Sequence, residues 1–102
     1  MAYLGEAIDA NLAAVSGEDA ALFHELRAAF IESASHHFDL MRRSRCDGNW
    51  QVAAMRLKGL AASFHAAELV TLADEALQSA PGEPAVLRSI DRLITGLSAT
   101  GA

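Results

Sequence analysis

Apolar residues recur every three or four positions along almost the whole chain, and this spacing restricts the fold more than any other feature. It is typical of amphipathic helices that bury one face. Only two prolines occur in 102 residues, and runs of β-branched residues, which favour strands, are absent. Hydrophobic residues make up 52% of the chain, enough to build a core. The sequence therefore predicts an all-α protein.

The pattern divides into five segments at helical spacing. Ser16 is predicted to cap the second helix, and Asn49, in an Asp47-Gly48-Asn49 turn, is predicted to cap the third. The segments comprise residues 4–15, about 18–43, 50–64, 69–77 and 84–97, and a frayed tail is expected from Ser98 to Ala102. The residues predicted to be buried are Leu4, Ile8, Leu12 and Val15; Phe23, Leu26, Phe30, Ala34, Phe38 and Met41; Trp50, Ala53, Ala54, Leu57, Leu60, Ala61 and Phe64; Leu69, Leu72, Ala73, Ala76 and Leu77; and Val86 or Leu87, Ile90, Leu93, Ile94 and Leu97.

The connections between these segments are short, and short loops join helices that pack as antiparallel neighbours. The expected architecture is an antiparallel four-helix up-and-down bundle with an additional short N-terminal helix. A chain of 102 residues is long enough for one compact domain, which we expect to span residues 1–102.

Composition argues against several classes of partner. The formal net charge is −5, and beyond Arg42, Arg43 and Arg45 there is no cluster of basic residues to neutralise nucleic-acid phosphates. No apolar run approaches membrane-spanning length, and the first residues lack the basic-then-apolar order of a signal peptide. A single cysteine, Cys46, suits a reducing compartment. The chain is therefore expected to be cytoplasmic, with neither a nucleic acid nor a membrane as partner.

The outward side of the third helix has an unusual composition. Met55, Lys58, Gly59 and Ala62 share one face, and Gln51 extends this face by one turn. A glycine inside a helix costs roughly 0.5–1 kcal/mol relative to alanine, and surface positions usually carry Glu, Lys or Gln. Small residues and a methionine favour contact with another surface. From spacing alone, that surface is either a partner or another helix of the same bundle.

The segment Ala54–Gly59 has the sequence Ala-Met-Arg-Leu-Lys-Gly, which resembles the Ala-His-x-Leu-Lys-Gly motif of bacterial histidine-phosphotransfer (Hpt) domains. These domains relay phosphate in multistep two-component signalling. Upstream, Asp47–Trp50 resembles the acidic turn before the family's active helix. Downstream, Ser63–Leu69 resembles the junction that opens the next helix. The resemblance covers about residues 18–79.

The resemblance implies a four-helix bundle whose third-helix face, carrying Met55, is exposed and meets the aspartate pocket of a receiver domain. Lys58 matches a family lysine that offsets phosphoryl charge, and Gly59 matches a small residue that lets the receiver approach. Two positions depart from the family pattern. Met55 replaces the phosphoaccepting histidine, and His65 replaces a junction glycine. A thioether lacks the nucleophilic imidazole nitrogen that phosphoryl relay needs.

These features predict a pseudo-Hpt protein that binds receiver domains without relaying phosphate and has no enzymatic activity, no metal and no cofactor. Its partner would be a response-regulator receiver domain or a histidine kinase, and it would act as a monomer. The predicted partner-binding residues are Gln51, Met55, Lys58, Gly59, Ala62, His65 and His37. No catalytic residue is predicted.

Three alternatives remain open at the level of sequence, the last of which is a remnant domain that has kept no partner. The first is an active phosphotransfer protein that uses a displaced histidine, His65 before His37 or His36. The second is a homodimeric assembly module that buries the same small-residue face against its own copy. His36 and Asp39 share a helix face, but two donors are too few to predict a zinc site. His24 is expected to be a surface residue.

Overall fold

The computed structural model describes residues 4–100, and the side chains of residues 8–98. It contains five helices and, within the described residues, no strand, so the all-α prediction is confirmed. The helices are α1 (Leu4–Ser16), α2 (Ala20–Arg43), α3 (Asp47–Ser63), α4 (Ala67–Leu77) and α5 (Pro84–Thr100). No helix in this part of the chain combines the length and apolar character needed to cross a bilayer.

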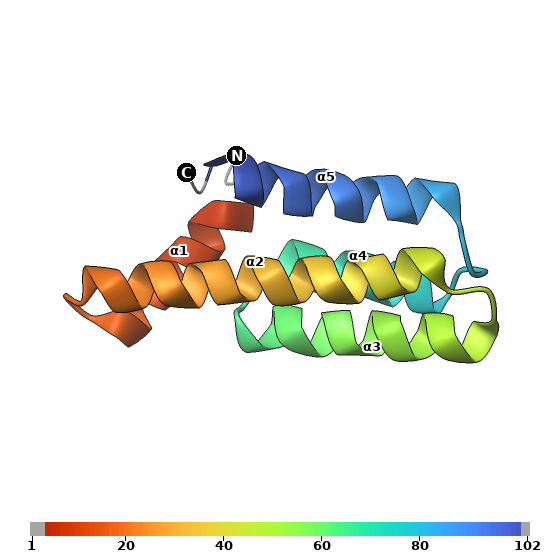
Figure 1. The fold of residues 1–102 in the computed structure, drawn as a ribbon, viewed down its shortest axis with the longest axis horizontal. Coiled ribbons are helices and arrows are strands. Elements are labelled where there is room, and N and C mark those ends of the chain that lie inside the picture. Colours follow the sequence, from red (N-terminus) through yellow and green to blue (C-terminus); the bar gives the residue numbers. More distant parts are fainter. Residues whose placement is uncertain (1–3, 101–102) are drawn as a thin grey trace.

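Figure 1 shows α2, α3, α4 and α5 lying along the long axis of the molecule, with successive helices running in opposite directions. The molecule is 44 Å long and measures 25 by 20 Å across. Helix α3 packs against α2 and α4, whereas α5 packs against α4, α2 and α1. Helix α1 crosses α2 obliquely near the end at which α2 begins (Figure 1). One side of α3 therefore faces away from all the other helices.

The core follows the predicted apolar stripes and is continuous through all five helices. The largest side chains with almost no exposed surface are Ile8, Leu12, Phe30, Met41, Trp50, Leu57, Leu69, Ile90 and Leu97. The indole Nε1 of Trp50 donates a 2.7 Å hydrogen bond to the Ala76 carbonyl and so ties α3 to α4. Of the two residues left open in α5, Val86 is buried and Leu87 is only partly buried.

Arg27 is a buried residue that the sequence did not predict. Its Nε donates a 2.8 Å hydrogen bond to the Asp9 carboxylate of α1, and its Nη2 donates a 3.3 Å hydrogen bond to the Leu97 carbonyl of α5. A buried guanidinium needs such partners because an unpaired buried charge is strongly unfavourable. Arg27 therefore joins α1 and α5 to α2.

The predicted starts of α2 and α3 are wrong. Helix α2 begins at Ala20, where the Asp19 carboxylate accepts a 3.0 Å hydrogen bond from the Leu22 amide. The Ser16 hydroxyl instead donates back to the Leu12 carbonyl inside α1. Helix α3 begins at Asp47, so Asn49 lies inside the helix rather than at its cap.

The inner face of α1 and the end of α5 also differ from prediction. Val15 is 67% exposed because the buried stripe continues from Ile8 and Leu12 to Ser16, which lies four residues beyond Leu12. The side chain of Leu4 lies outside the described set. Helix α5 continues to Thr100 rather than fraying at Ser98, and the last two residues lie outside the described part of the chain.

Candidate docking surface

The exposed side of α3 is not covered by any other described helix. We call Met55, Gly59 and Ala62, which are all exposed, the α3 stripe. Met55 is 62% exposed, and its neighbours Ala54 and Leu57 are fully buried. Gln51 is exposed one turn before Met55. The interpretation in which another helix of the bundle covers this face is therefore wrong.

Gly59 is not required by the packing of α3. A Cβ atom added at this position would have no neighbour within 4 Å. The described fold therefore offers no steric reason for a glycine in the middle of this helix, where alanine would be more stable.

Lys58 borders the α3 stripe on the side of α4. Its Nζ lies 2.7 Å from the Asp74 carboxylate of α4, and both side chains are partly exposed. A surface pair of this kind contributes at most about 1 kcal/mol to stability. The ammonium group of Lys58 is therefore already paired within the chain, which the sequence pattern did not indicate.

Val52 extends the exposed apolar surface toward the N-terminus of α3, and the sequence reasoning missed it. It is 49% exposed and lies one helical turn before Met55, on the same side. It also lines a groove of about 320 Å³ between the end of α2 and the start of α3. The groove is lined by Leu40, Arg43, Ser44, Asn49, Val52, Ala53 and Arg56. The same three-residue spacing that grouped Met55 with Lys58 would have identified Val52.

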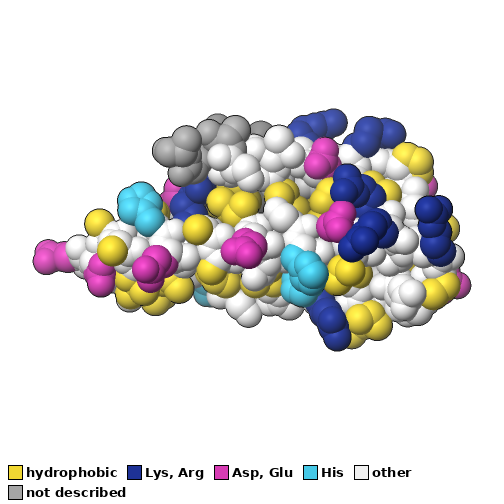
Figure 2. All heavy atoms as spheres, viewed as in Figure 1, with side chains coloured by type: hydrophobic (Ala, Val, Ile, Leu, Met, Phe, Trp, Pro, Cys, Tyr) yellow, Lys and Arg dark blue, Asp and Glu magenta, His cyan; other side chains and the backbone are white. Residues whose placement is uncertain are grey.

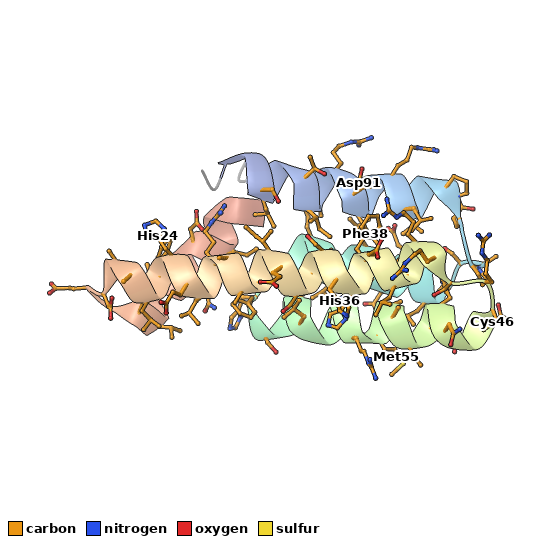
Figure 3. All side chains as sticks on the ribbon, viewed as in Figure 1. His24, His36, Phe38, Cys46, Met55 and Asp91 are labelled. Carbon is orange, nitrogen blue, oxygen red and sulfur yellow. The ribbon has the colours of Figure 1, made fainter. Side chains whose placement is uncertain are left out.

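His37 lies on α2 beside α3. Its Nδ1 is shielded from solvent and makes no hydrogen bond to the described residues. Partial burial lowers the pKa of His37 below its ordinary value, and the nearby charges of His36 and Arg56 lower this pKa further. The influence of Arg56 indicates that His37 borders the exposed side of α3. Figure 3 shows His36 and Met55 at similar levels along the molecule.

His65 adopts a left-handed backbone conformation, with φ at 56°. It follows the end of α3, where its amide donates to the Ala62 carbonyl and the Ala66 amide donates to the Ala61 carbonyl. This pair of bonds is a Schellman motif, which usually has glycine at the left-handed position. The backbone of His65 therefore turns the chain from α3 into α4, and its side chain is exposed.

The remaining candidate residues form no metal site. Asp39 binds Arg42 at 2.7 Å and Arg43 at 3.0 Å. The hydrogen bond from Arg42 is the main reason that the pKa of Asp39 lies below its ordinary value. Within the part of the chain that the structure describes, no three His, Cys, Asp or Glu side chains are close enough to hold a metal. His24 is exposed, as expected, and lies edge-on to the Phe23 ring.

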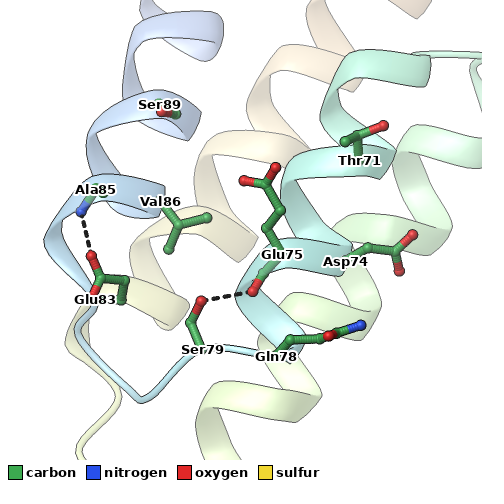
Figure 4. A pocket seen from close by; sticks show the side chains of 9 residues that line it. All are labelled: Thr71, Asp74, Glu75, Gln78, Ser79, Glu83, Ala85, Val86 and Ser89. Atoms are coloured by element: carbon green, nitrogen blue, oxygen red, sulfur yellow. Dashed lines mark hydrogen bonds between the residues drawn. The ribbon is translucent and has the colours of Figure 1, made fainter.

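A second groove, of about 630 Å³, lies between α4 and α5 (Figure 4). The carboxylates of Glu83 and Asp74, which line this groove, already have partners within the chain. Glu83 accepts a 2.9 Å hydrogen bond from the Ala85 amide at the start of α5, and Asp74 is paired with Lys58. The Ser79 hydroxyl donates to the Glu75 carbonyl at 2.7 Å. The polar groups of this groove therefore mainly stabilise the loop that connects α4 to α5.

In comparisons with known proteins, no family model matches the chain, and neither a curated protein nor a solved structure matches it. The case for its function therefore depends on the Ala54–Gly59 motif and on the geometry of α3.

Proposed function

We propose that this chain is a cytoplasmic pseudo-Hpt protein of a bacterial two-component pathway, in which α2–α5 form the Hpt-like bundle and α1 is an addition. In this proposal the α3 stripe docks a receiver domain, and no phosphate is transferred to the chain. The observation that carries the proposal is the exposed methionine at the position where the family motif has its phosphoaccepting histidine. The motif residues Ala54 and Leu57 are buried, whereas Met55 is 62% exposed.

The exposed residues of α3 fit docking better than they fit folding. Gly59 and Ala62 would let the backbone of a partner approach closely, and the open space around Gly59 leaves room for this approach. Met55 offers a flexible, polarisable apolar contact where an imidazole would otherwise stand. Gly59 lowers the stability of the isolated helix, whereas alanine and methionine are good helix formers, so the glycine is the residue of this row that folding does not explain.

The chemistry of Met55 explains why phosphate would not be relayed. Transfer from a receiver requires that the P–O bond of its aspartyl phosphate break as a P–N bond forms to an imidazole nitrogen. The methionine side chain ends in a thioether and offers no nucleophilic nitrogen to which the P–N bond could form. The Lys58 ammonium, which in the family lies beside the phosphoryl group, is paired with Asp74 here. Both features favour binding without phosphate transfer.

A protein of this kind would act through occupancy. By binding one state of a receiver more tightly than the other, it would shift the population toward the bound state. The receiver would be unavailable to a histidine kinase or to a working Hpt domain while it is bound. The protein would then act as a competitor of these partners, as a sequestering protein or as an adaptor that holds the receiver in place.

Restoring the nucleophile tests this proposal. Met55→His and the unaltered protein are each incubated with labelled phosphoreceivers of the source organism, and acid-labile label on the small chain is measured. Gln51→His is the matched control, because it places an imidazole on the same face one turn away. Label on Met55→His alone is the expected result. Label on none of the three proteins would contradict the proposal.

The same experiment separates the first two alternatives. Acid-labile label on the unaltered protein would show an active phosphotransfer protein, and variants of His65, His37 and His36 would then identify the acceptor. Light scattering of the unaltered protein gives its mass in solution. A dimer that dissociates when Met55 is replaced by aspartate would favour the homodimeric assembly module instead.

A further inference from the structure

The two sides of the α3 stripe differ in charge. On the side of α4, Lys58 is paired with Asp74. On the side of α2, Arg56 is exposed and forms no ion pair with the described residues. Arg43, which is paired with Asp39 at 3.0 Å, lines the adjoining groove together with Arg56. The α2 side is therefore the side that can attract an anionic partner.

Basic residues are concentrated in the segment from the end of α2 through α3, although the chain as a whole is acidic. Of the eight Lys and Arg residues in a chain of net charge −5, five lie between positions 42 and 58, where the only acidic residue is Asp47. Figure 2 shows the basic side chains gathered mainly toward the end of the molecule at which α2 ends, and acidic side chains at the opposite end. This asymmetry would orient an approaching acidic surface.

The groove itself has an apolar lining between its two arginines. Val52, Leu40 and Ala53 contribute this lining. The exposed part of Val52 is continuous with Met55, because the two residues are three positions apart on one helix face. A volume of about 320 Å³ accommodates one large apolar side chain of a partner. Carboxylates beside that side chain would meet the guanidinium groups at the rim, where bidentate pairing is favoured.

We propose that the groove between α2 and α3 is a specificity subsite for the receiver domain, which places there an apolar side chain flanked by carboxylates. This inference rests on the proposed function and adds the orientation of the partner. The contact area of the receiver extends from the α3 stripe toward the end of α2 and away from α4, where Asp74 is paired with Lys58. Its acidic edge lies over Arg56, and its apolar side chain packs on Val52.

Binding of unaltered and variant chains to the isolated receiver domains of the source organism, measured by titration calorimetry, tests this orientation. Arg56→Glu replaces attraction by repulsion, so affinity should fall at least about tenfold at low ionic strength. The loss should shrink at high salt, because exposed charges are screened. Val52→Asn removes an apolar contact and should weaken binding about fivefold.

Arg88→Glu is the matched control. Arg88 is an exposed arginine on α5, which packs against α1, α2 and α4 rather than α3. Arg88→Glu makes the same change in net charge, and at physiological ionic strength receiver affinity should stay within about twofold, because exposed charges more than a Debye length from the contact are screened. Circular dichroism melts of all variants establish that each one folds, and Arg56→Gln is the milder replacement if Arg56→Glu does not fold.

Three outcomes would overturn the inference. If Met55→Asp abolishes receiver binding while Arg56→Glu and Val52→Asn leave it unchanged, the proposed function stands and the groove is not part of the contact. If Arg88→Glu weakens binding as much as Arg56→Glu, net charge rather than the groove governs affinity. If no receiver domain binds the unaltered protein, the proposed function fails and the subsite fails with it.

Discussion

The inward and outward faces of α3 belong to the same helix but follow different requirements. Trp50 and Leu57 on the inward face are almost completely buried and connect α3 to its neighbours. The outward face carries Met55, Gly59 and Ala62, all exposed. Of these three residues, Gly59 is the one that disfavours a surface helix, because alanine and methionine are good helix formers. Folding therefore accounts for the inward residues, whereas it explains neither the glycine nor the exposed apolar side chain of the outward face.

The largest expected effect separates the two faces directly. Leu57→Ala creates a cavity in the core and should lower the free energy of unfolding by roughly 2–5 kcal/mol. Met55→Ala, on the exposed face, should change it by less than about 0.5 kcal/mol. Urea denaturation followed by circular dichroism measures both values. Equal losses for the two variants would show that Met55 is packed as a core residue.

A smaller effect is expected at the corner that ends α3. The left-handed backbone conformation of His65 is strained because its Cβ atom is crowded there. His65→Gly removes this strain and should stabilise the protein by about 1 kcal/mol. His65→Ala keeps the strained backbone and should give no comparable gain. Thermal denaturation of both variants distinguishes a backbone effect from loss of the imidazole. A destabilised His65→Gly protein would mean that the imidazole itself supports the fold.

Gly59→Ala should stabilise the protein by roughly 0.5–1 kcal/mol, because alanine is the better helix former and its Cβ has free space. Under the proposed function the same methyl group should weaken receiver binding. Gly96→Ala on α5 is the control, since its Cβ also meets nothing within 4 Å. It should raise stability without affecting the receiver. Unchanged receiver affinity in Gly59→Ala would argue against close approach at this position.

The smallest effect concerns pH. The lowered pKa of His37 in the folded protein means that the unfolded chain binds a proton first as pH falls through about 6.5. Stability should therefore decline as pH falls from there toward the folded pKa, and the decline should stop below it. His37→Gln should flatten this part of the profile, with His24→Gln as control. Denaturant titrations between pH 4 and 8 measure the slope, and an unchanged slope in His37→Gln would contradict the assignment.

Most of the helices could be predicted because their signals are local. An apolar residue every three or four positions identifies a helix and its buried side regardless of what packs there. This reasoning located all five helices and the buried stripes of α2 to α5. The helix starts were less predictable, because Asp19 and Ser16 are both acceptable caps. Which one accepts the amide depends on where α1 ends. Val15 was wrongly predicted to be buried because the buried stripe of α1 continues from Leu12 to Ser16.

The candidate surface was partly predictable. The motif spacing identified Met55, Gly59 and Ala62, and the structure places them on one exposed face. The motif spacing did not lead us to Val52, although the same spacing applies to this residue. It also did not indicate the pairing of Lys58 with Asp74. The fifteen residues between Lys58 and Asp74 carry no signal of their contact, which forms only because α3 and α4 pack together.

The sequence by itself determined that the chain is helical, most of the residues that form the core of α2 to α5, and that Met55 rather than a histidine stands at its position in α3. Tertiary structure alone decided that α3 keeps one face uncovered and that Arg27 is buried between α1 and α5. It also decided that Lys58 is paired with Asp74, whereas Arg56 on the other side of the α3 stripe forms no ion pair with the described residues. The physical reason is the range of the interactions. Helix formation and amphipathicity depend on neighbours three or four residues apart, whereas exposure and charge pairing depend on which helices lie side by side.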